Sequence, residues 1–467
     1  MPEPNKNGLN MLEGSIVDKL FIFAIPLALT TFFQQLLNTA DVLISGKYIG
    51  TNAMAAIGNN TPIVSLIVSL FVGLSIGANV VIARHIGSRQ FGRIKMSIST
   101  AILTAIISGL SVMLLAEFLV DTSLDAMGVP SEVREMTETY LRFFLLGMPG
   151  ISLYNFAAAI IRSRGDTRTP LYSLLIASVL NLILDFLAVQ VFGMGIDGIA
   201  GATSIANYAN AFYLLHSLST TKDILHVHIY ELRQVGIDYR EIRRMIAIGL
   251  PAGIQGMVFS VSNLIIQSAI NSLGADAMAA SAAGFSLEIN VYTFMNAFGQ
   301  ATTTFVSQNF GAHNLPRCFR ITKLALIVET LVTLGLSALT LIFSRELLML
   351  FSTDERVIEL ATIRLWYIVA PYILNGSIEI LSGALRGYGI SMPPAIVTLI
   401  CVCGVRIIWV YTVFAADPTY ENLMITYGIS WAFTTALLAV IYIYFKRRLA
   451  DGRHLGINQH YPDSEKA

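Results

Sequence analysis

About twelve apolar segments, each roughly 20 to 30 residues long, follow one another along the sequence between short polar stretches. A segment of that length crosses a bilayer as a helix, because a helix satisfies its own backbone hydrogen bonds in lipid. The segments are too long, and too rich in Leu, Ile and Ala, for the strands of a barrel. Hydrophobic residues make up 55% of the chain and charged residues only 13%. The sequence predicts an all-α polytopic membrane protein.

The predicted spans alternate in direction, and the basic residues orient them. We place the spans near residues 19–46, 56–84, 94–119, 137–163, 169–192, 196–219, 246–273, 277–308, 318–344, 357–384, 392–414 and 422–446. The N-terminal arm (1–18), the loops after even-numbered spans and the polar tail (447–467) hold 23 of the 30 Lys and Arg residues. Because cytoplasmic loops are rich in Lys and Arg, both termini are expected in the cytoplasm.

The two halves of the chain repeat each other. The segment from Pro26 ends in IGTNAMAAIG, and the segment from Pro251 ends in LGADAMAAS. The offset of roughly 225 residues divides the chain into two six-helix bundles, an N-terminal lobe (19–219) and a C-terminal lobe (246–446). Such repeats place a substrate site between them near the midplane of the membrane. The linker 220–245 ends in a stretch predicted to be an amphipathic helix at the cytoplasmic interface.

The first half carries two aspartates within its spans. Gln34, Asn38 and Asp41 share one face of the first helix by their spacing. In the fifth span, Asn181 and Asp185 are four residues apart and also share a face. The second half has no acid at either matching place. An aspartate in a membrane helix costs about 2.5–3.5 kcal/mol on insertion, so its default interpretation is functional.

Two buried carboxylates close together cannot both stay ionised at low cost. One takes up a proton, or both coordinate a cation. Asn155 in the fourth span and Thr203 in the sixth could add oxygen ligands of the kind that suits H⁺ or Na⁺. Structural roles remain alternatives, because Asp41 could cap a broken helix and Asp185 could pair with Asn181 alone.

Other polar and adaptable residues are candidates for lining a central cavity. They are Pro26, Gln34, Asn38, Met257, Asn263, Gln267, Glu288 and Tyr292, with packing as the alternative for Met257 and Tyr292. Pro26 also gives the first span a bending point. Arg406 is interpreted as the one clearly intramembrane arginine and as a partner for a buried acid, with a substrate contact as the alternative. Glu379 is interpreted as structural.

Composition and motifs exclude several other classes of function. The net charge is zero, so nucleic acid is not an expected partner. Nucleotide-binding loops, zinc motifs and Ser/His/Asp sets are missing from the sequence, which predicts neither an enzyme nor a cofactor.

The motifs resemble the multidrug and toxic compound extrusion (MATE) family of bacterial efflux transporters. The likeness runs in family order from residue 12 to about 447, through AIPLALTTFFQQLLNTADVLISGKYIG, IIRSRGDTRTP, NLILD, GIAGAT and VSQNFGAHN. It implies a twelve-helix antiporter that exports organic, often cationic, drugs against inward H⁺ or Na⁺. By similarity the cation site comprises Asp41, Asn155, Asn181, Asp185 and Thr203, and a Na⁺ would be held by Asp41, Asn181, Asp185 and Thr203. Bending at Pro26 would accompany protonation.

The sequence thus predicts a monomeric, multi-pass transporter of the bacterial plasma membrane. Its partners would be small organic molecules and the lipid bilayer. Two alternatives stay open. One is a flippase for lipid-linked saccharides, whose branch typically has extra helices and a strongly basic cavity, and the other is a membrane receptor or scaffold that transports nothing.

Overall fold

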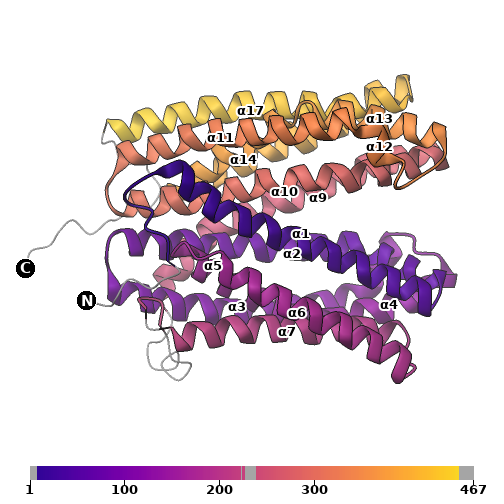
Figure 1. Cartoon of the computed structure of the whole chain (residues 1–467), viewed down its shortest axis with the longest axis horizontal. Helices are drawn as coiled ribbons and strands as arrows, with labels where there is room; N and C mark the ends of the chain where they lie inside the picture. The colour runs from indigo at the N-terminus through magenta and orange to yellow at the C-terminus, as the bar shows by residue number, and fades with distance from the viewer. Residues whose placement is uncertain (1–7, 222, 227–237, 452–467) are drawn as a thin grey trace, which may run out of the picture.

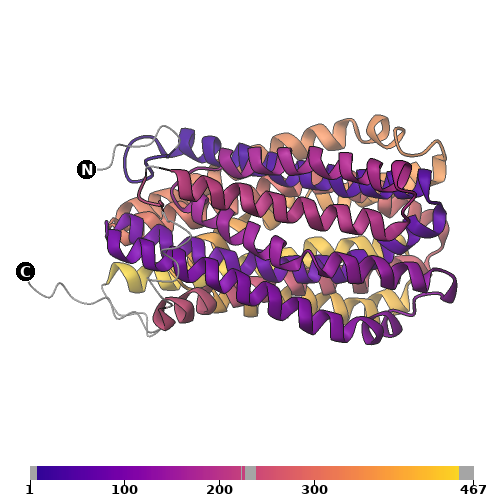
Figure 2. The ribbon, with the colours of Figure 1, turned by 90° about the horizontal axis from the view of Figure 1, so that it is seen from below.

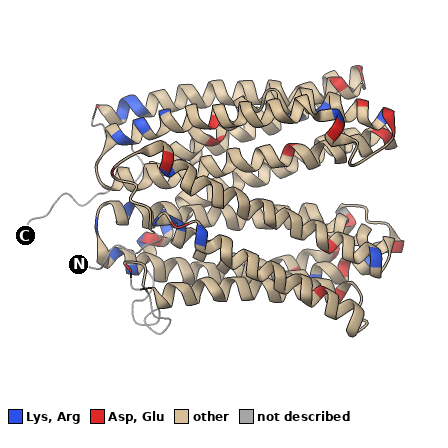
Figure 3. Cartoon of the chain, in the orientation of Figure 1, with Lys and Arg blue, Asp and Glu red and all other residues tan. Residues whose placement is uncertain are grey.

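The computed structural model describes residues 8–221, 223–226 and 238–451, and the regular elements in these ranges are helices. They form two groups that lie side by side and run in nearly the same direction (Figure 1). The view turned by 90° shows the same common direction (Figure 2). Charged residues gather at the two ends of the helices and are sparse between them (Figure 3). This distribution matches a protein that crosses a bilayer, because the middle of the membrane disfavours charge.

The N-terminal lobe is the lower group in Figure 1. It comprises α1 (Ile16–Tyr48), α2 (Thr51–Gly87), α3 (Phe91–Ala126), α4 (Ser131–Leu145), α5 (Met148–Ser163), α6 (Arg168–Phe186) with the π-helical turn η1 (Leu187–Val191), and α7 (Ile196–Thr220). α4 and α5 form one span that bends by 46°. The bend falls where Pro149 enters the first turn of α5, because proline cannot continue the preceding helix.

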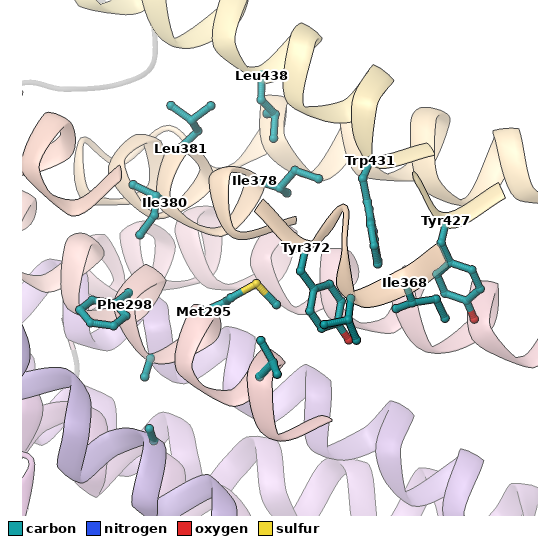
Figure 4. Packing of buried hydrophobic residues seen from close by; sticks show 14 of the residues in the cluster. Met295, Phe298, Ile368, Tyr372, Ile378, Ile380, Leu381, Tyr427, Trp431 and Leu438 are labelled. Carbon is teal, nitrogen blue, oxygen red and sulfur yellow. The ribbon is translucent and has the colours of Figure 1, made fainter. Parts of the chain in front are cut away.

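The C-terminal lobe repeats this arrangement. It comprises α9 (Tyr239–Ser272), α10 (Ala275–Gly311), α11 (Leu315–Ile342), α12 (Ser344–Leu348), α13 (Glu355–Val369), α14 (Tyr372–Gly387), α15 (Met392–Thr398), η2 (Leu399–Gly404), α16 (Val405–Trp409), η3 (Val410–Phe414) and α17 (Tyr420–Ala450). α13 and α14 are bent by 41° at Pro371. Its core holds aromatic rings from α14 and α17, among them Tyr372, Tyr427 and Trp431 (Figure 4).

The all-helical membrane architecture predicted from the sequence is confirmed. In the described ranges, eight helices are long and apolar enough to span a membrane, and the two bent pairs bring this number to ten. α7 and α10 are long as well, although they carry more small and polar residues, and they complete the twelve predicted segments. Residues 239–245, expected in an interfacial connector, form the first turns of α9. Residues 222 and 227–237 of the linker lie outside the described residues.

α1 and α9 are among the helices that contact both lobes. The first half of α1 packs on α10, where Phe21 meets Phe298 and Phe23 meets Phe305 with ring centroids 5.6 and 5.8 Å apart. The second half of α1 packs against α6 in its own lobe. α9 likewise packs against α2 of the N-terminal lobe and against α15 and α16 of its own lobe. A movement of one lobe relative to the other must therefore strain or shift α1 and α9.

The lobes meet closely at the end of the molecule that holds both termini. A Cβ atom added to Gly77 of α2 would lie 2.1 Å from the carbonyl oxygen of Met245 on α9. Closer to the termini, a Cβ atom on Gly311 of α10 would lie 2.1 Å from the carbonyl oxygen of Arg84. The helices thus touch backbone to backbone, and glycine is required there because any side chain would hold them apart.

Candidate functional site

The N-terminal lobe encloses a pair of acids between α1 and α6. Asp41 on α1 is 4% exposed and Asp185 on α6 is 0% exposed. Their carboxyl groups lie close enough to form a hydrogen bond with each other when one of them holds a proton. Oγ1 of Thr203 on α7 donates to Oδ2 of Asp41 at 3.3 Å. The structure therefore brings these three predicted residues together from three helices.

The acid pair has more acceptors than donors. Oδ1 of Asp41 and both carboxylate oxygens of Asp185 have no hydrogen-bond partner among the described residues. Burying a charge or an unsatisfied acceptor is costly, so such a site favours uptake of a proton or a cation. The structure gathers no third acid, His or Cys around the pair in the described ranges. The neighbouring atoms that could coordinate a cation are hydroxyl and amide oxygens, which suit hard cations.

The two predicted asparagines differ in their surroundings. Asn181 lies one turn before Asp185, is 3% exposed, and its Nδ2 has no acceptor within the described chain. Asn155 on α5 is also buried, but its Nδ2 donates to the carbonyl oxygen of Ile151 in its own helix at 2.8 Å. Asn181 therefore adjoins the acid pair along α6, whereas a ligand role for Asn155 stays a prediction.

Tyr140 is a member of this neighbourhood that the sequence did not reveal. Its buried ring on α4 lies within electrostatic reach of both Asp41 and Asp185. The ring stacks on Phe144 with 5.9 Å between centroids, which holds it in place. It is one of 18 tyrosines, and its position at the start of an apolar span carries no distinctive spacing. Only the packing of α4 in this lobe shows that it faces the acids.

A cavity of about 620 Å³ lies between the lobes, next to their close contact and on the side away from the termini. Its α2 wall is uncharged and lined by small residues such as Ser65, Ser69 and Gly73, while the C-terminal lobe contributes aromatic and charged side chains. Of the predicted lining residues, Asn263, Gln267, Glu288 and Tyr292 line this cavity, and Pro26, Gln34, Asn38 and Met257 lie outside its lining. Pro26 and its neighbours instead belong to the continuous helix α1.

Three arginines, rather than one, stand in the cavity wall. Arg364 donates to both carboxylate oxygens of Glu288, at 2.6 and 3.1 Å. Arg386 lies 3.8 Å from Glu379, which also accepts from the hydroxyl of Tyr292 at 3.4 Å. The interpretation of a single intramembrane arginine was wrong, because Arg364 and Arg386 sit near span ends in the sequence yet are 4% and 8% exposed.

Arg406 was expected to partner a buried acid, and the structure corrects this interpretation. Its hydrogen bonds go to Ser262, Asn263 and Ser430, which are all neutral. Both acids that line the cavity are bonded to other arginines. The reason is positional: α16 faces α9 and α17, and these helices present hydroxyl, amide and aromatic groups at that level.

Replacing Glu288 with glutamine should destabilise the protein by about 3–5 kcal/mol, because Arg364 would remain as a buried charge without its counter-ion. Thermal unfolding of the purified protein should show a lower Tm by several degrees. The double variant Glu288→Gln/Arg364→Gln, which removes both charges, should recover part of this loss. An unchanged Tm in the single variant would mean that the pair contributes no net stability.

Comparison with known proteins gives the family. A family model described as MatE matches the chain twice, at residues 26–187 and 251–412, so the two matches begin 225 residues apart. The chain is 26% identical over 440 residues to the probable multidrug resistance protein YoeA of Bacillus subtilis (strain 168), covering 93% of this chain and 94% of YoeA. It is 25% identical over 457 residues to a FAD transporter of Shewanella oneidensis, covering 95% of this chain and 94% of that protein.

A solved structure of similar fold is described as the outward-facing conformation of a multidrug resistance MATE family transporter of the MOP superfamily. Its TM-score is 0.86 with 20% sequence identity, over 96% of this chain and 99% of that one. The family model covers most of both halves, and the two matches keep the spacing of the internal repeat. This chain therefore belongs to the MatE family, the multidrug and toxic compound extrusion transporters.

Proposed function

We propose that this protein is a secondary active exporter that moves organic compounds, often cationic, out of the cell in exchange for inward H⁺ or Na⁺. The observation that carries the proposal is the acid pair of Asp41 and Asp185, buried and short of donors inside the N-terminal lobe. An inward cation supplies about 2.3 kcal/mol per 100 mV of membrane potential, which is enough to drive an uphill step.

α1 is the element through which ion binding would reach the substrate cavity. Its second half carries Asp41 in the N-terminal lobe, while its first half is packed on α10 of the C-terminal lobe. Neutralising the acid pair removes repulsion between α1 and α6 and so changes the packing that α1 prefers. Because α10 also lines the cavity, through Glu288 and Tyr292, the change in α1 favours release of the substrate outside.

The charge distribution supports the proposed orientation. Lys and Arg gather at the end of the molecule that holds both termini (Figure 3), which supports a cytoplasmic location for that end. The lobes are in backbone contact there, so the conformation is closed toward the cytoplasm. We propose a monomer in the bacterial plasma membrane. The names of the relatives include both multidrug resistance proteins and a FAD transporter, so the substrate class has to be decided on this chain's own cavity.

The test is transport by purified protein in proteoliposomes, with a pH gradient or a Na⁺ gradient imposed one at a time. Movement of ethidium or norfloxacin that depends on one of the gradients is the expected result, and the effective gradient identifies the coupling ion. No gradient-driven movement of either compound would refute the proposal and favour a receptor or scaffold. Movement of a lipid-linked saccharide in its place would favour the flippase.

A further inference from the structure

Arg406 is a buried cation whose hydrogen-bond partners are neutral. It is 1% exposed and lies in the wall of the central cavity. Its Nη1 donates to Oδ1 of Asn263 at 2.9 Å and to Oγ of Ser262 at 3.3 Å, and its Nε donates to Oγ of Ser430 at 3.4 Å. Within the described chain, its Nη2 donates to no residue. One edge of the guanidinium group is thus left for another acceptor.

The other charged groups of the cavity do not neutralise Arg406. Glu288 lies within electrostatic reach of it, but both of its oxygens are bonded to Arg364. Glu379 is paired with Arg386. The lining therefore holds three arginines and two glutamates, and the wall formed by α2 adds no charge. One positive charge remains uncompensated in the lining, and burying a charge without a counter-ion is costly.

A further buried acid lies outside the cavity. Glu329 on α11 accepts from the hydroxyl of Thr333 at 2.7 Å and lies against Gly376 of α14. It is not one of the lining residues, and its electrostatic neighbour among the lining acids is Glu379 rather than Glu288. Glu329 therefore does not compensate the excess positive charge at Arg406.

Two aromatic rings lie beside this cation. The guanidinium carbon of Arg406 lies 4.2 Å from the ring centroid of Tyr427 and 6.0 Å from that of Trp431. The ring of Trp431 packs between those of Tyr372 and Tyr427 (Figure 4). Its centroid lies 5.5 Å from that of Tyr372 and 5.6 Å from that of Tyr427. All three line the cavity. A flat apolar surface next to a fork of N–H donors suits an aromatic compound that carries a carboxylate or a similar anion.

The internal repeat gives this position a counterpart. The 225-residue offset between the two family matches places Arg406 where Asn181 stands in the first half. Asn181 is neutral but adjoins the acid pair on α6, whereas Arg406 on α16 is itself a cation. The surroundings of Asn181 therefore suit a cation, and those of Arg406 suit an anion.

We propose that Arg406 is the binding group for an anionic substituent of the exported compound, so that the cavity accepts aromatic acids and zwitterions in addition to, or in preference to, simple cations. This inference rests on the proposed export function, because it names a substrate class for the same cavity. The anion would accept hydrogen bonds from Nη2 of Arg406 and replace the missing counter-charge, while its aromatic frame packs against Tyr427 and Trp431.

The experiment compares two probes that differ in one charge, namely norfloxacin, which has a carboxylate, and its ethyl ester, which has none. Binding is measured calorimetrically on the purified full-length protein without any ion gradient, so that the result does not depend on transport. The wild type should bind the acid about tenfold or more tightly than the ester. Arg406→Gln should remove this preference and leave the affinity for the ester unchanged. Arg406→Lys should retain part of it, because lysine keeps the charge without the fork of donors.

Arg356→Gln is the matched control. It removes the same charge from an exposed side chain, 64% exposed and paired with Glu359, outside the cavity lining. Its affinities should equal those of the wild type. A wild type without preference for the acid would overturn the proposal, and so would an Arg406→Gln variant that keeps the preference or loses both probes equally. If Arg406→Gln does not fold, the wild-type preference and a selective loss in Arg406→Lys decide the question. Failure of gradient-driven transport would refute the exporter function separately.

Discussion

Asp41→Asn should reduce gradient-driven efflux by at least about tenfold while leaving the protein folded. The asparagine keeps the size of the side chain and can still accept from Thr203 at the position of Oδ2. It cannot take up a proton or hold a cation by charge, so the acid pair becomes a single carboxylate that no longer links ion binding to the packing of α1. Substrate binding in the cavity should persist, because Asp41 is not part of its lining.

The measurement is ethidium efflux from proteoliposomes under the gradient that drives the wild type, at equal amounts of reconstituted protein. Asp18→Asn is the control, since Asp18 is an exposed acid in the first turn of the same helix. It should transport at the wild-type rate. Asp185→Asn should resemble Asp41→Asn, and the double variant should be little worse than either, because the two residues act as one unit. Normal efflux by Asp41→Asn would remove the acid pair from the mechanism.

Gly77→Ala should abolish closure of the lobes at the end that holds the termini. The added methyl group would lie 2.1 Å from the carbonyl oxygen of Met245 and 2.9 Å from the backbone nitrogen of Gly249. Both are backbone atoms inside helix α9, so neither can turn aside as a flexible side chain would. The two helices must separate instead, which disfavours the conformation described here. We expect a fall in transport of at least about tenfold and a lower Tm.

Gly58→Ala provides a control in the same helix. Gly58 lies in α2 with nothing within 4 Å of an added Cβ atom, and an alanine there should preserve transport and slightly raise stability. Cysteine labelling can report closure directly. The native cysteines are first replaced by alanine, namely Cys318, Cys401 and Cys403. A single cysteine is then introduced at Ser307, and a membrane-permeant maleimide is added to the purified protein. Ser307 is fully buried at the contact of the lobes. Labelling should be slow in the parent and Gly58→Ala and fast in Gly77→Ala. Equal rates, with transport intact, would show that this contact does not control closure.

Much of the site in the N-terminal lobe could be predicted because helical spacing and composition carry the necessary information. Asp41 and Asp185 stand out in the sequence, since carboxylates are rare in apolar spans and each is costly there. Thr203 was a candidate oxygen ligand in the sixth span and also by resemblance to the family, and the structure places its hydroxyl on Asp41. Tyr140 could not be found in this way, because a tyrosine near the end of a span is common at membrane interfaces.

The charges of the C-terminal lobe were harder to interpret. Arg364 and Arg386 lie where a span meets its loop, so counting alone assigns them to the membrane surface. The bend of 41° between α13 and α14 and the packing of α10 against both helices bury them beside Glu288 and Glu379. The same packing leaves Arg406 among neutral groups. Arg406, for which the sequence suggested a buried acid as partner, therefore has no counter-ion in the part of the chain that the structure describes.

The order of residues is sufficient to establish a membrane protein of twelve helical segments in two related halves, with an acid pair in the first. These features depend on local quantities, namely the length of apolar segments, the spacing of residues on one helix and the transfer cost of a carboxylate. The partners of each buried charge, the closed end and the basic wall of the cavity depend on which helices touch. Contacts between segments far apart in the chain, such as Gly77 with Met245 and Arg84 with Gly311, follow from tertiary packing and leave no periodic signal in the sequence.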